Sequence, residues 1–141
     1  LEVGEQATPF EHRSFADEVA RCQRYYYKVG ESGAGGSGYA VGSNFAVGMY
    51  YNASDFRAFI DFPCIMRATP TVASSSDTNA FRIIRANGSD YPDLIQTAGG
   101  TAMHGAHLFT NDDLGSATAG DGAMLINGGT TNAFISFDAE L

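Results

Sequence analysis

The sequence predicts a mostly β fold, an antiparallel β-sandwich of jelly-roll-like type with one short N-terminal α-helix. Short blocks of β-branched and aromatic residues alternate with Gly, Asn, Asp and Pro, roughly every 8 to 12 residues, which is typical of about eight strands in a sandwich. Only residues 13–27 have helical spacing. Helices and strands do not alternate along the chain, so a parallel sheet is not expected.

The domain organisation follows from the first residues. Residues 1–13 are expected to form a connector, because the Thr8-Pro9 step favours extended backbone. Residues 14–141 form a single C-terminal β domain that opens with the helix. The chain begins at Leu1 without a charged and then apolar leader, so we expect an excised fragment and no signal peptide.

The helix has a start signal and a stop signal. Ser14 is the predicted N-cap, and Asp17 and Glu18 suit the positive end of the helix dipole. Strand-favouring tyrosines follow, so the helix is expected to end near Arg24. One face is expected to be buried, because four residues follow i, i+4, i+7, i+11 spacing: Phe15, Val19, Cys22 and Tyr26.

The remaining elements are strands and turns. GESGAGGSG, residues 30–38, predicts a loop. Strand-like blocks cover residues 39–52, 56–62, 63–74 and 80–86. Asn87-Gly88 predicts a hairpin after the last of these, and a second Asn-Gly stands at 127–128. The final stretch alternates, with one face expected to be buried: Ala133, Ile135, Phe137 and Ala139.

Composition and charge exclude several partners. The 141 residues carry a net charge of −8 with Lys28 as the single lysine, so no basic surface for nucleic acid is expected. No apolar run approaches the roughly 20 residues that span a bilayer, so we expect no membrane insertion. Charged residues are only 17% of the chain, which indicates a surface that something other than water covers in part. Cys22 and Cys64 are expected to be buried free thiols.

Three stretches stand out as sequence motifs: LEVGEQATPFEHRSFADEVARCQRYY at 1–26, FPCIMRATPTV at 62–72 and AFISFDAEL at 133–141. In these stretches and in their order, the chain resembles the C-terminal region of tailed-bacteriophage tail-fibre and related virion structural proteins. The matching stretches cover roughly 45 of the 141 residues.

The resemblance implies a terminal domain of a phage fibre, exposed on the virion after assembly in the bacterial cytoplasm. It implies a homotrimer that contacts the preceding fibre domain and binds a host receptor, such as a bacterial surface glycan, without catalysis. Three weak sites would act together through avidity. The alternative is a structural trimerisation or capping module without receptor binding. A depolymerase is a third class, which release of reducing ends from polysaccharide would reveal.

The candidate receptor-binding residues lie in two segments expected to be loops, 87–93 and 104–121. Tyr91 could stack on a sugar while Asp90 and Asp93 accept hydroxyl hydrogen bonds. His104 and His107 form H-G-A-H, which could also be read as two ligands of one metal. No carboxylate or cysteine completes such a set, and no calcium loop spacing is present. We therefore predict no metal, no cofactor and no catalytic residues.

The aromatic residues are expected to form either the core or a contact between subunits. They lie on amphipathic or strand patterns, where large apolar side chains are usually buried. The residues concerned are Phe10, Phe15, Tyr26, Phe59, Phe62, Phe81, Phe134 and Phe137.

Overall fold

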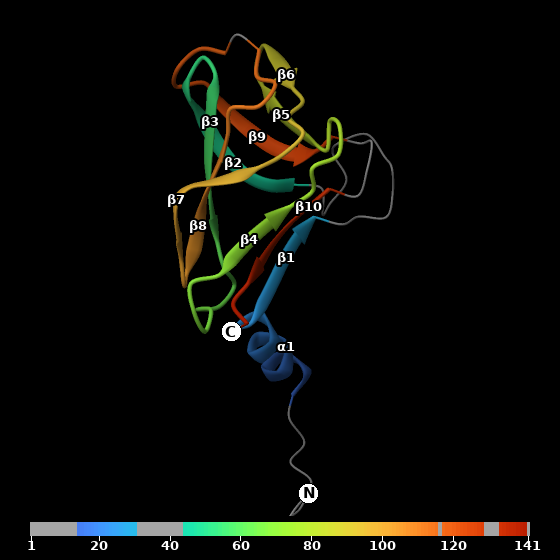
Figure 1. Ribbon diagram of the computed structural model, residues 1–141, viewed down its shortest axis with the longest axis vertical. Helices are drawn as coiled ribbons and strands as arrows, with labels where there is room; N and C mark the ends of the chain where they lie inside the picture. Colours follow the sequence, from blue (N-terminus) through green and yellow to red (C-terminus); the bar gives the residue numbers. More distant parts are fainter. Residues whose placement is uncertain (1–13, 31–43, 116, 129–132, 141) are drawn as a thin grey trace, which may run out of the picture.

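Two antiparallel sheets face each other in a sandwich-like arrangement, as the sequence predicted (Figure 1). The computed structural model describes residues 14–30, 44–115, 117–128 and 133–140. The helix α1 spans Phe15–Gln23. Ten strands follow in the described residues: β1 (Tyr26–Gly30), β2 (Asn44–Asn52), β3 (Asp55–Asp61), β4 (Thr71–Ser74), β5 (Phe81–Arg85), β6 (Gly88–Asp90), β7 (Gln96–Ala102), β8 (Gly105–Thr110), β9 (Gly122–Asn127) and β10 (Phe134–Asp138).

The two sheets differ in size. The small sheet has the order β1-β10-β4, and the large sheet has the order β6-β5-β9-β2-β3-β8-β7. They meet where β4 lies beside β7. Ser74 Oγ donates to the Ile95 carbonyl at 2.8 Å, and Thr101 Oγ1 donates to the Pro70 carbonyl at 3.1 Å. The small sheet therefore covers one face of the large sheet.

The core lies between the sheets and follows the strand period of two. On β3, Phe56, Ala58 and Ile60 are buried, while the residues between them point the other way. The predicted alternation of the last strand is confirmed, since Ala133, Ile135, Phe137 and Ala139 are all buried.

The boundaries of α1 are confirmed, but its predicted burial is wrong. Ser14 Oγ accepts from the Asp17 backbone N–H at 3.1 Å, and Arg24 is the C-cap. No residue of α1 is buried, and Phe15 is 86% exposed. The physical reason is that the chain enters β1 directly at Tyr26, so the helix projects from the end of the sandwich (Figure 1). Its i, i+4, i+7 face has no sheet to cover it.

Several strand and turn expectations need correction. The expected loop 104–121 contains β8, which pairs with β3 inside the large sheet. The strand was missed because its small residues do not resemble a strand pattern. A Cβ on Gly105 would lie 2.7 Å from the Ile60 carbonyl oxygen, so only glycine permits this close approach of the strands. In the block 63–74, only Thr71–Ser74 is a strand.

The two Asn-Gly pairs have different outcomes. The hairpin at the first pair is confirmed as β5-β6, but Arg85 pairs with Gly88, so Ala86 and Asn87 are the turn residues. At the second pair the chain passes from β9 in the large sheet to β10 in the small one. Of the loop predicted over 30–38, all but the first residue lies outside the described part of the chain, as does Phe10.

The cysteines are free, but the expectation that both are buried is wrong. Cys22 is exposed on α1, and Cys64 is half-buried. Cys64 Sγ lies 3.4 Å from the Ala20 carbonyl, which ties the loop after β3 to the helix.

Candidate functional site

The structure does not bring the five predicted receptor residues together. Tyr91, Asp90 and Asp93 lie at the end of the sandwich formed by β5 and β6. His104 is in the turn between β7 and β8, and His107 is within β8. Because a strand rises about 3.3 Å per residue, His104 lies roughly 25 Å along β8 from the loop that holds the first group. The five residues therefore do not form one compact cluster.

Asp90 is an internal structural residue. It is 6% exposed, and its Oδ2 accepts hydrogen bonds from the Tyr50 hydroxyl and from Arg85 Nη1. Its Oδ1 accepts from the Gly115 backbone N–H at 2.9 Å. The carboxylate therefore joins β2, β5, β6 and the loop before β9, and its burial in this network keeps it from contacting a receptor.

The same network changes the chemistry of Tyr50. Burial and then the hydrogen bond to Asp90 raise the pKa of the Tyr50 hydroxyl well above its usual value near 10. The folded protein therefore holds this proton at a pH where the unfolded chain has released it.

Stability is accordingly expected to fall as pH rises above about 10, because there the unfolded state binds fewer protons. Below that pH the contribution of Tyr50 is fully present. Urea unfolding between pH 8 and 11.5 measures it, with a slope of up to about 1.4 kcal/mol per pH unit. Tyr50→Phe is the control. The free energy of unfolding of this variant should fall less steeply with pH, because only Tyr27 and other titrating groups still contribute. An unchanged slope would contradict the assignment.

Asp93 also has a structural use. It is half-buried, and its Oδ1 accepts from the Asn79 backbone N–H at 2.7 Å. Asn79 has a left-handed backbone with φ of 55°, so this bond holds an unfavourable turn. Asp112 Oδ2 in turn accepts from the Asp93 N–H at 2.9 Å. The carboxylates of Asp90, Asp93 and Asp112 at this end therefore accept hydrogen bonds that connect neighbouring segments of the chain.

Tyr91 remains the most accessible candidate at this end. Its side chain is among the exposed large apolar side chains, at 37%. The Arg82 guanidinium lies 5.4 Å from its ring centroid, and Arg82 Nη2 donates to Ser89 Oγ at 3.0 Å. A ring held by a guanidinium on one side is a platform on which a sugar ring could stack.

The two histidines lie in different surroundings. His104 is exposed, and its carbonyl accepts from the Phe62 N–H at 2.9 Å. His107 is half-buried on β8, where it pairs with Phe59 on β3. Within the described residues no three His, Cys, Asp or Glu side chains are grouped as metal ligands would be.

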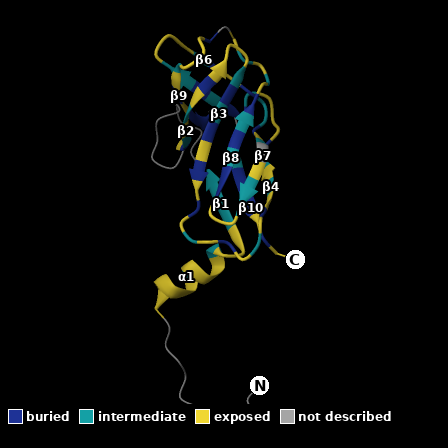
Figure 2. Cartoon of the chain, turned by 90° about the vertical axis from the view of Figure 1, so that its left-hand side faces the viewer, coloured by how far each residue is buried: buried dark blue, intermediate teal, exposed yellow. Residues whose placement is uncertain are grey.

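The largest unusual feature is an apolar face that the sequence analysis did not locate. We call it the outer sheet face: the side of the large sheet turned away from the small sheet. Figure 2 shows exposed residues among buried ones along β2 and β3. Its large apolar side chains are Val47 (71% exposed), Tyr51 (63%), Met49 (57%), Phe59 (53%) and Met124 (38%).

The strand register makes this face continuous. Ile84 on β5 pairs with Met124 on β9, and Met124 pairs with Val47 on β2. The β2-β3 ladder pairs Gly48 with Ala58, so the next residues along, Val47 and Phe59, lie beside each other. The result is one apolar row across five strands that ends at His107.

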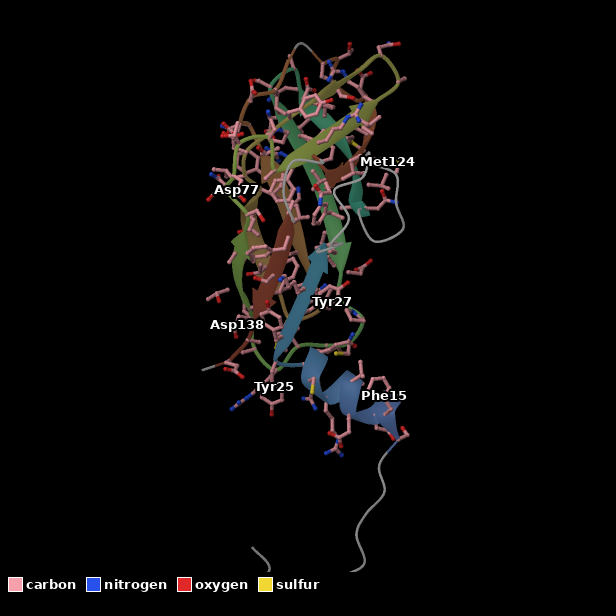
Figure 3. All side chains as sticks on the ribbon, turned by 90° about the vertical axis from the view of Figure 1, so that its right-hand side faces the viewer. Phe15, Tyr25, Tyr27, Asp77, Met124 and Asp138 are labelled. Carbon is pink, nitrogen blue, oxygen red and sulfur yellow. The ribbon has the colours of Figure 1, made fainter. Side chains whose placement is uncertain are left out.

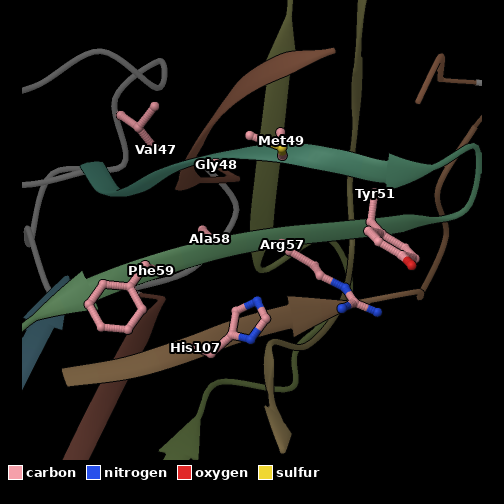
Figure 4. A pocket seen from close by; sticks show the side chains of 8 residues that line it. All are labelled: Val47, Gly48, Met49, Tyr51, Arg57, Ala58, Phe59 and His107. Carbon is pink, nitrogen blue, oxygen red and sulfur yellow. The ribbon is translucent and has the colours of Figure 1, made fainter. Parts of the chain in front are cut away.

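Two shallow hollows lie along this row and share Val47. The first, of about 510 Å³, is shown in Figure 4 with Val47 and Phe59 at one end, Tyr51 at the other and His107 between them. The Arg57 guanidinium lies over the Tyr51 ring, 4.1 Å from its centroid, and pairs with Asp55 at 2.8 Å. That hydrogen bond raises the pKa of Arg57 above its usual value. The second hollow, of about 400 Å³, is lined by Met124 and Ile84.

The described aromatic residues expected in the core or a subunit contact differ in burial. Phe62, Phe81 and Phe137 are buried, and Phe134 is half-buried. Phe15, Tyr26 and Phe59 are exposed, at 86%, 47% and 53%. The exposed group is the set that another molecule could cover.

Comparisons with family models, with characterised proteins and with solved structures find no match to this chain. None of the helices described is long and apolar enough to cross a membrane. The fold and surface define a β-sandwich with an apolar sheet face that the described residues leave uncovered.

Proposed function

We propose that this chain is a self-associating, non-enzymatic terminal domain of a phage tail-fibre or tail protein, assembled as a homotrimer on the virion. The observation that supports the proposal best is the outer sheet face. Five large apolar side chains on adjacent strands are 38–71% exposed there, and no described element of the chain covers them. Monomeric proteins rarely expose contiguous apolar patches larger than roughly a few hundred Å².

A second copy of the chain is the partner that best fits this face. The face is largely apolar, and the ion pair that the described residues place on it, Arg57 with Asp55, is satisfied within the chain. Permanent contacts between identical chains are of this apolar kind, like a core cut in two. A chain of net charge −8 can also approach its own copies more easily on such an uncharged face.

Within such a trimer we propose that Tyr91 is a receptor contact, binding a bacterial surface glycan. Its ring is exposed at an end of the sandwich, close to the hairpin β5-β6. One exposed ring gives weak affinity, and three copies would raise the avidity without further contacts.

A structural capping module without receptor binding is the second candidate. The observation that favours it is the engagement of Asp90 and Asp93 in internal hydrogen bonds, which leaves Tyr91 without a free carboxylate beside it. In that case the role of the domain is to join copies of the chain through the outer sheet face, without a receptor site.

Adsorption of the labelled protein to candidate host bacteria, with and without their surface polysaccharide, separates the two functions. The expected result is saturable binding that is lost with the polysaccharide and is reduced at least tenfold by Tyr91→Ser. His104→Ser is the matched control at the distant β7-β8 turn, and it should bind as the parent does. An assembled trimer that binds no competent host would support the capping module.

A further inference from the structure

The helix α1 has little tertiary support in the described part of its own chain. It is nine residues long, and isolated helices shorter than about 12 to 15 residues are marginal in water. None of its residues is buried, and Figure 3 shows Phe15 far from the body of the sandwich. Besides the Ser14 cap, the helix has the contact from Cys64 Sγ to the Ala20 carbonyl, near its C-terminal end. The tertiary packing that stabilises most short helices is therefore weak, above all at Phe15.

The exposed apolar residues of α1 have the spacing of a coiled-coil seam. Phe15, Val19 and Cys22 are separated by four and then three residues, which is the d-a-d spacing of a heptad. Phe15 and Cys22 are exposed, and Val19 is half-exposed. These three residues form the seam referred to below.

The charges of α1 are arranged so that identical helices can approach one another. With Phe15 and Cys22 as d positions, Asp17 is at f and Arg21 at c, both on the side opposite the seam. Of the flanking positions, Ala16 and Gln23 at e are uncharged, and Glu18 at g carries a charge. In parallel helices a g residue faces the e residue of the neighbour's next heptad, so Glu18 would face the uncharged Gln23 and not another Glu18.

We propose that α1 packs, through the seam, against α1 of the other copies in parallel, forming a short helical collar where the chain enters the sandwich. The occupant of the seam is a second copy of this chain. In a closed cyclic assembly all copies point the same way along the axis, so identical helices near the axis are parallel. This inference rests on the self-association proposed above and adds a second contact to the outer sheet face.

Oxidative cross-linking through Cys22 tests the collar directly. Two d-position cysteines of neighbouring helices would lie close enough for a disulfide, whose Cα atoms are usually about 4.4–6.8 Å apart. The protein carrying Cys64→Ser, so that Cys22 is its only thiol, is treated with copper phenanthroline in air; each disulfide gives two electrons and two protons to the oxidant. A covalent dimer is expected on a non-reducing gel, and its rate of formation should not change on tenfold dilution of the assembled protein.

The matched control moves the thiol to the opposite side of the helix. Arg21→Cys, combined with Cys22→Ser and Cys64→Ser, places it at position c, and cross-linking should be at least tenfold slower. Equal rates for the two thiols in an assembled protein would overturn the collar and leave the proposed function standing. A protein that sediments as a monomer under the same conditions would overturn both.

Discussion

The double substitution Val47→Thr and Phe59→Thr is expected to convert the assembled protein to monomers. Both side chains are more than half exposed in the single chain, and threonine keeps the strand preference, so the fold of each copy should remain. Burying one large apolar side chain contributes about 1.5–3 kcal/mol, so two per copy change the association constant by at least about 100-fold. Sedimentation equilibrium over a range of protein concentrations measures the change.

Ile65→Thr is the matched control for this prediction. Ile65 is 65% exposed, similar to the two substituted residues, but it lies in the segment between β3 and β4, outside the outer sheet face. The control should assemble as the parent does. If the double variant also assembles with the parent's affinity, the outer sheet face is not the contact between copies.

Asp90→Ala is expected to lower the free energy of unfolding by about 3–5 kcal/mol, the range found when one partner of a buried ion pair is removed. The Arg85 side chain is only 11% exposed and would lose its counter-charge. The Tyr50 hydroxyl and the Gly115 N–H would each lose their acceptor as well. Urea unfolding measures the loss, in the Val47→Thr and Phe59→Thr background so that assembly does not mask it.

Asp93→Ala is the comparison for Asp90. Asp93 is half-buried and its carboxylate accepts one hydrogen bond, from Asn79, so its removal should cost about 1–2 kcal/mol. A cost for Asp90→Ala no larger than for Asp93→Ala would contradict the structural role of the network.

What could be predicted from the sequence is mainly local. The cap at Ser14 and the end of α1 depend on interactions within one or two turns, and both were correct. The alternation of 133–139 also appears in a single segment, because one face of a strand repeats every second residue. The fold class followed from the spacing of such segments.

What could not be predicted depends on pairing between distant segments. The strand β8 has few strand-favouring residues, and Gly105 is explained only by its neighbours on β3. Asp90 could not be distinguished from an exposed turn residue until β2 brought Tyr50 to it, 40 residues away in sequence. The outer sheet face had a partial signal in NFAVGMYYN, where both alternating sets are largely apolar, but the sequence does not say which set faces the core.

The position of β10 has a consequence for how the protein is made. This last strand lies between β1 and β4, and it pairs with β1 from Tyr26↔Asp138 to Gly30↔Phe134. A nascent chain interrupted before Phe134 therefore cannot close the small sheet, and the core faces of β2 and β3 stay uncovered. The earliest strand must therefore wait for the latest one, so the small sheet can form only after residues 26–138 have all been synthesised.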